Sequence, residues 1–177
     1  MFWISLILLT GILLLAFPSS AGGMMPTKVL VRVVSKGAKI IGSNVGGAAV
    51  RIADVETGET LAQGRQEGGT GETDRIMLQP RPSGKPVYGT PGAALFLAEI
   101  PLDRPRRVEI QAEAPLAYPQ AIQRGSKTVT LIPGQDMVGE GVIIELDGLI
   151  VNILSPVAGG AIRRGEEVTV RAEVKML

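Results

Sequence analysis

The chain has 177 residues, which is enough for one domain or for one domain and part of a second. It contains no cysteine and no histidine, which excludes disulfides, thiolate catalysis and zinc sites built on these side chains. The net charge is +1 and no long basic run is present, so we do not expect nucleic acid as a partner.

The N-terminal segment is an uncharged apolar run from Phe2 to Phe17, followed by proline and small residues up to Ala21. The run is shorter than the roughly 20 apolar residues of a spanning helix and fits the core of a signal peptide, although no Lys or Arg precedes it. We expect residues 1–21 to be a signal peptide cleaved after Ala21. The alternative is an uncleaved anchor, in which only residues 2–17 contact a membrane. Both interpretations export the remainder, to the periplasm, to the extracellular space or to the outward side of a membrane.

After Lys28 the chain alternates short apolar patterns with Gly- and Pro-rich turns. Strands are predicted over residues 28–36, 48–55, 75–79, 93–100, 107–114, 128–132 and 142–146, with a further short strand starting at Leu61. The clearest is 107–114, where every second residue is apolar, as in a half-buried strand. No amphipathic helix is expected after Pro18. The pattern predicts an all-β fold, an Ig-like or transthyretin-like β-sandwich preceded by the N-terminal signal or anchor helix.

The core of this sandwich is predicted from the alternation of apolar residues along each strand. Aromatic residues make up only 3% of the chain, so the core must be aliphatic. The inward residues are predicted to be Val29, Val31, Val33, Val50, Ile52, Leu95, Leu97, Val108, Ile110, Val129, Leu131, Val142, Ile144 and Leu146.

Several stretches resemble carboxypeptidase regulatory-like domains, which are transthyretin-like seven-stranded sandwiches. They are residues 29–33, residues 45–52 with the step Gly47-Ala48, the turn at 54–59 with Thr57-Gly58, and the later strand 108–114 before Tyr118. The resemblance implies one such sandwich over residues 28–147. The loops 64–74 and 80–92 are long for this family. Hydrolysis of the hydroxyisourate type is not implied, because that activity depends on histidines.

The C-terminal residues 148–177 resemble the first two strands of a bacterial Ig-like module. The matching stretches are residues 150–156 and 159–174, with strands expected at 149–154 and 168–174. Two strands alone do not make a stable domain. They could add to the first sandwich, pair with another chain or be the start of a truncated domain. We expect them to mediate assembly through Leu149, Ile150, Val151, Ile153, Leu154, Val168 and Val170.

No catalytic constellation is found, because the usual general base is absent and no phosphate loop has the required order. The chain is therefore predicted not to be an enzyme, and no cofactor is expected. Glu67, Glu72 and Asp74 lie in or beside a glycine-rich loop, which could supply oxygen ligands for weak calcium binding. The more conservative interpretation of these carboxylates is a solvated turn.

These observations predict a non-catalytic exported β-sandwich that serves as a structural or accessory subunit of a cell-envelope or surface assembly. Its partners would be other proteins or further copies of itself. The alternative is a carbohydrate- or peptide-binding module that uses the loops 64–74 and 80–92.

Overall fold

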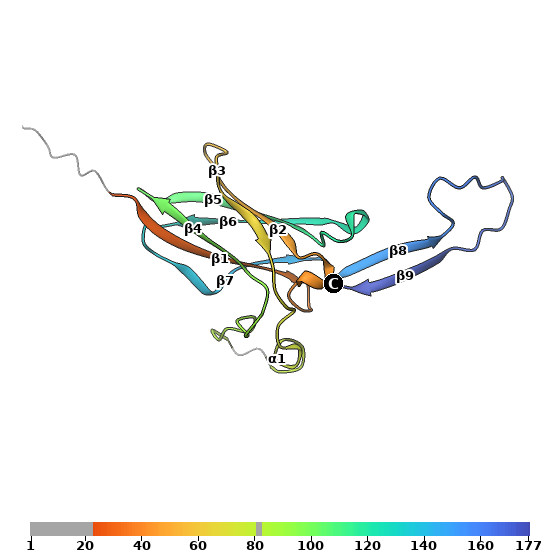
Figure 1. Ribbon diagram of the computed structural model, residues 1–177, viewed down its shortest axis with the longest axis horizontal. Helices are drawn as coiled ribbons and strands as arrows, with labels where there is room; N and C mark the ends of the chain where they lie inside the picture. The colour runs from red at the N-terminus through yellow and green to blue at the C-terminus, as the bar shows by residue number, and fades with distance from the viewer. Residues whose placement is uncertain (1–22, 81–82) are drawn as a thin grey trace, which may run out of the picture.

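The computed structural model describes residues 23–80 and 83–177 (Figure 1). The predicted signal peptide or anchor at residues 1–21 lies outside this part of the chain. Within the described residues, no helix is both long enough and apolar enough to cross a lipid bilayer.

The described chain is all-β, as the sequence predicts, and its strands form three sheets. One sheet has the order β4-β1-β7, with β1 antiparallel to β4 and parallel to β7. A second, fully antiparallel sheet has the order β3-β2-β5-β6, and β8 and β9 form a third. The bounds are β1 (Met25–Ser35), β2 (Ala48–Asp54), β3 (Thr60–Gln66), β4 (Phe96–Leu102), β5 (Arg106–Ala114), β6 (Gln123–Leu131), β7 (Met137–Leu146), β8 (Leu149–Ser155) and β9 (Arg171–Met176).

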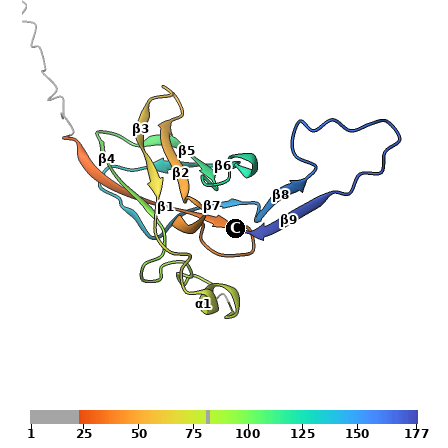
Figure 2. The same ribbon diagram turned by 45° about the vertical axis from the view of Figure 1, so that its right-hand side comes forward.

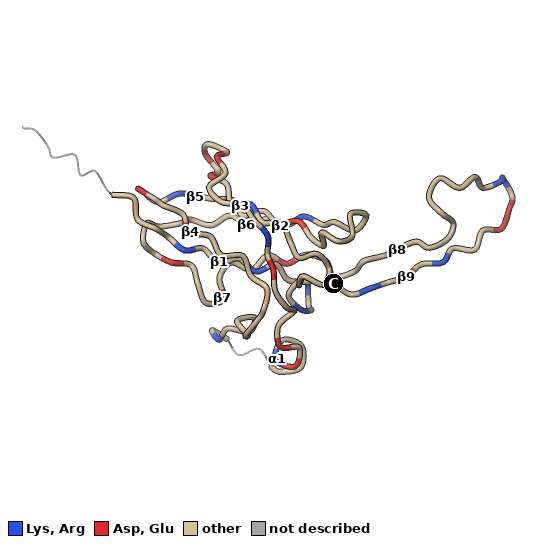
Figure 3. Tube along the Cα trace, in the orientation of Figure 1, with Lys and Arg blue, Asp and Glu red and all other residues tan. Residues whose placement is uncertain are grey.

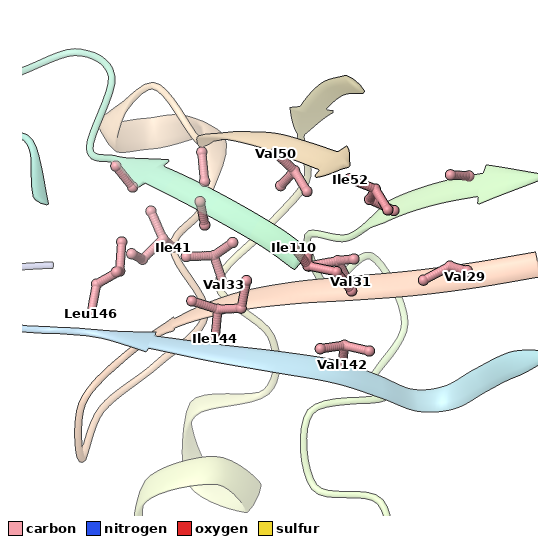
Figure 4. Packing of buried hydrophobic residues seen from close by; sticks show 14 of the residues in the cluster. Val29, Val31, Val33, Ile41, Val50, Ile52, Ile110, Val142, Ile144 and Leu146 are labelled. Carbon is pink, nitrogen blue, oxygen red and sulfur yellow. The ribbon is translucent and has the colours of Figure 1, made fainter. Parts of the chain in front are cut away.

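The first two sheets face each other and enclose one aliphatic core (Figure 4). On β5 the residues alternate between buried and partly or fully exposed positions, so Val108 and Ile110 point inward. The prediction is confirmed for most of the core: Val29, Val31, Val33, Val50, Ile52, Val108, Ile110, Leu131, Val142, Ile144 and Leu146 are all buried. Val129 is partly buried against the same core.

The prediction is wrong for β4. Leu97 is exposed and Leu95, which precedes the strand, is only half-buried, whereas Ala98 and Ile100 point into the core. In residues 93–100, apolar residues stand at both odd- and even-numbered positions. Alternation alone therefore does not show which side chains point into the core. The choice is made by pairing, because Ala98 lies opposite the buried Val29.

The predicted strand at residues 75–79 is also wrong. Residues Thr73–Met77 form a short helix, α1, with a single buried residue, Ile76. This side chain enters a small second apolar cluster with Val34, Ile40 and Tyr88. In Figure 2, α1 itself lies below β1. The described parts of the loops, residues 67–80 and 83–95, therefore pack on the outer surface of the sandwich through their own apolar residues. Two further strands begin earlier than predicted, since β6 starts at Gln123 and β7 at Met137.

One buried side chain joins the two sheets of the sandwich. Gln66, at the end of β3, is fully buried. Its Oε1 accepts a hydrogen bond from the Val33 N–H at 2.6 Å, and its Nε2 donates to the carbonyls of Val33 and Ile41, both at 2.9 Å. The Ile41 N–H also donates to the Val33 carbonyl, at 3.0 Å. The amide and residues 39–41 thus take the place of a strand beside β1, beyond Val31, the last residue that pairs with β4.

Candidate protein interaction site

The third sheet is a two-stranded ribbon that projects from the end of the sandwich (Figures 1 and 2). Its strands β8 and β9 are antiparallel and are joined by residues 156–170. The ribbon is anchored at its base, where Ile150 and Leu177 are buried in the main core and the Leu177 N–H donates to the Gly148 carbonyl at 2.8 Å. Lys175 Nζ also lies 5.7 Å from the centre of the Tyr118 ring.

One face of this ribbon is entirely apolar. Alternation places Leu149, Val151 and Ile153 of β8 on the same side. The register sets them opposite Met176, Val174 and Ala172 of β9, respectively. These six residues define the apolar ribbon face. Its five large side chains are between 51% and 66% exposed, so no part of the described chain covers this face.

The opposite face is polar beyond its base. Asn152 and Glu173 are paired across the strands, and Glu173 and Lys175 form an ion pair at 3.3 Å. The hydrogen bond with Glu173, followed by the charge of that carboxylate, raises the pKa of Lys175. Figure 3 shows that the charged residues of the ribbon lie on β9 and near the tip, whereas β8 carries none. The charged residues of the paired strands, Arg171, Glu173 and Lys175, therefore lie on the side opposite the apolar ribbon face.

The structure brings together only some of the predicted interaction residues. Leu149, Val151 and Ile153 share the apolar ribbon face, whereas Ile150 is buried at the base. Leu154 is exposed at an irregularity in the ladder between Ile153 and Ser155.

The second predicted strand of the ribbon begins later than expected, at Arg171 instead of residue 168. Val168 and Val170 precede it, at exposed positions of the same parity as Ala172. Val174 lies within the predicted strand 168–174 but was not singled out as an interaction residue, and Met176 was missed, although the same alternation runs through both.

The calcium candidates are all exposed. Glu67 follows β3, Glu72 is the residue before α1, and Asp74 lies in the first turn of that helix. Nowhere in the residues that the structure describes do three acidic side chains come close enough to hold a metal ion.

A buried arginine, not anticipated from the sequence, organises the loop beside β7. Arg32 is 4% exposed, and its Nη1 donates to the carbonyls of Gly139 and Glu140 at 2.6 and 2.8 Å. Glu140 Oε1 accepts from the N–H groups of Val87 and Tyr88. Burial lowers the pKa of Arg32, and the charge of Glu140 opposes that effect. These contacts fix the segment around Tyr88 to the sheet, which is a structural role.

The outer face of the β3-β2-β5-β6 sheet has shallow hollows. One is lined by the polar side chains of Arg51, Gln63, Gln111 and Glu113. Ala49, Val50 and Gly64 complete the lining. Three of these side chains, Arg51, Gln111 and Glu113, pair with neighbours, for example Gln111 with Glu109 at 2.9 Å. The hollow is wide open to solvent, unlike the enclosed concave sites that usually bind small molecules.

Comparison with protein-family models, with curated proteins and with solved structures finds no match to this chain. The function must therefore be argued from the chain's own surface.

Proposed function

We propose that this protein is a non-catalytic exported β-sandwich module that serves as a structural or accessory subunit of a cell-envelope or surface assembly. The observation that carries the proposal is the apolar ribbon face, which is held away from the sandwich and exposed. Contiguous apolar patches of more than a few hundred Å² are uncommon on monomeric soluble proteins and mark interaction sites.

The energetics favour a covered ribbon. Removing apolar surface from water contributes about 25 cal/mol per Å², so each large side chain such as Leu149 or Ile153 would contribute roughly 1 kcal/mol or more when covered. An isolated two-stranded ribbon is at best marginally stable in water. A partner that packs on the face would supply the missing layer.

A lipid bilayer is a poor candidate for that layer. Within the described chain, β8 and β9 pair only with each other, so each has an outer edge of backbone groups without strand partners. Such edges cannot be satisfied in hydrocarbon, which is why only helices and closed barrels span membranes. A protein surface can both cover the apolar side chains and leave the edges in water.

The proposal includes export of the chain and its membership of a carboxypeptidase regulatory-like family. The support for export is the apolar N-terminal run ending at Ala21. The support for a carboxypeptidase regulatory-like, transthyretin-like sandwich is the set of resembling stretches together with sheets of three and four strands. The Ig-like resemblance of residues 148–177 is supported by the antiparallel pairing of β8 with β9.

The loop-based alternative has less support. Ile76 of α1 and Tyr88 of the loop after it are buried in the second cluster instead of pointing outward. A carbohydrate site usually presents aromatic faces to the sugar, and Tyr88 is only 5% exposed. The ribbon is therefore the better candidate surface.

Site-specific photo-crosslinking of the full chain in the producing cell tests the proposal. A photoreactive residue at position 151, on the apolar ribbon face, should give a cross-linked protein product of higher mass. The matched control is position 152, whose side chain points to the polar face, and which should give little or none. The proposal fails if position 151 gives no protein product, or if both positions react equally.

A further inference from the structure

We propose that the apolar ribbon face docks on the same face of a second copy of this chain. The two ribbons would pack face to face about a twofold axis and form a small four-stranded sandwich. This inference rests on the proposed function and names its partner.

The face is chemically self-complementary. All six of its residues are apolar, and the charged residues of the ladder, Arg171, Glu173 and Lys175, have the other parity. Two copies can therefore approach without burying an unpaired charge, which would be costly. The Glu173–Lys175 ion pair forms within one copy and stays in water on the outside. A twofold contact of identical patches is closed, so it yields a dimer and not a fibre.

The geometry leaves room for the second ribbon. Strands β8 and β9 lead away from the sandwich in both views of the ribbon (Figures 1 and 2). Two sheets pack with about 10 Å between them, a spacing that interdigitating Leu, Ile, Val and Met side chains fill. Val151 and Val174 are paired at the centre of the face, so they would lie at the twofold axis.

The area is sufficient for a weak specific dimer. Covering five large side chains that are each more than half exposed, on both copies, would remove on the order of 1,000 Å² in total. That is near the lower end of specific interfaces. Val168 and Val170 continue the parity of Ala172 beyond the start of β9. Contact with a second copy would favour extension of β9 to include Val168 and Val170, and this extension would enlarge the interface.

Edge-to-edge pairing of two ribbons is the competing geometry. It would satisfy the β8 edge of each copy but leave both apolar faces on one open surface, still in water. Face-to-face packing buries the side chains that the structure leaves exposed, and for that reason it is the arrangement that we propose.

The first test uses the absence of cysteine from the chain. A Val151→Cys variant of the full chain is treated with a short bis-maleimide, and the products are separated by mass. We expect a dimer of this chain. Asn152→Cys, with the adjacent side chain on the polar face, is the matched control and should give little dimer. Far-UV circular dichroism checks that both variants keep the β-fold.

The second test is a charge exchange at the same position. Val151→Lys alone and Val151→Glu alone should each weaken dimerisation about tenfold or more, because like charges would meet at the axis. Co-expression of the two, with different tags, should restore a mixed dimer. Asn152→Lys should leave dimerisation unchanged.

The outcomes separate this inference from the proposed function. If position 151 cross-links to a different protein and the charge exchange restores no mixed dimer, the second copy is the wrong partner and the assembly role stands. If position 151 yields no protein product, both proposals fail.

Discussion

The sandwich and the ribbon have the same local pattern and opposite burial. On β5, Val108 and Ile110 are completely buried because the β4-β1-β7 sheet lies opposite. On β8, Val151 and Ile153 alternate in the same way but are more than half exposed. Period-two alternation therefore identifies residues that share a face of a sheet, and it does not establish that another layer covers that face.

The largest expected effect tests the sandwich side of this comparison. Ile110→Ala should lower the free energy of unfolding by about 2–5 kcal/mol, because it leaves a cavity among aliphatic side chains that relax only partially. Urea denaturation of the variant and the parent chain measures the difference. A loss below about 0.5 kcal/mol would mean that Ile110 does not lie in a packed core.

A smaller effect is expected within β8 itself, where two isoleucines three residues apart differ in burial. Ile150 is 1% exposed at the base, so Ile150→Ala should cost about 2 kcal/mol, at the low end of the range because a two-stranded ribbon relaxes more easily. Ile153→Ala removes the same atoms from a 61% exposed site and should change stability by no more than about 0.5 kcal/mol under conditions in which the chain is monomeric. Equal costs for the two variants would contradict the observed burial.

The smallest effect concerns pH and the turn after β2. Asp54 accepts hydrogen bonds from the N–H groups of Thr57 and Glu56 and lies 3.4 Å from Arg106 Nη1. The Thr57 bond is the main cause that lowers the pKa of this carboxyl. Since the folded-state pKa is below the unfolded value of about 3.9, the stabilisation is present above that value and is lost as the pH falls through the folded pKa.

Asp54→Asn should therefore reduce the loss of stability on acidification, and it should be less stable than the parent near neutral pH. Thermal melts between neutral pH and about pH 3 measure both effects. Parallel acid profiles for the two proteins would show that the charged form of Asp54 is not favoured by folding.

Much of the sandwich could be predicted from the sequence, because β1, β2, β5 and β7 carry β-branched residues at alternate positions. The predictions that were wrong concern residues whose structure depends on contacts with other strands. Leu97 and Ile100 are both apolar, and only the register with β1 decides which points inward. The sequence predicts a strand at Ile76 because short apolar stretches do not distinguish a strand from one turn of helix. The polar start of β6 is a strand because it pairs with β5.

The candidate site was predicted in part for the same reason. Alternation placed Leu149, Val151 and Ile153 together, but it could not show that Ile150 reaches the core of the sandwich. That contact depends on how the ribbon leaves β7, which is a property of the whole fold. Met176 was missed because the predicted strand ended two residues before it.

The side chain of Gln66 has a consequence for how this sandwich tolerates change. Its amide offers an acceptor and a donor to Val33, as a peptide group of a neighbouring strand would, and so it shields a stretch of β1 from edge pairing with other chains. Asparagine is one methylene shorter, and an ionised glutamate of the same shape has no donor. Residues 39–41 also pair with this side of β1 through their backbone. The glutamine and this short segment together thus give β1 the protection against aggregation that other sheets obtain from an additional strand.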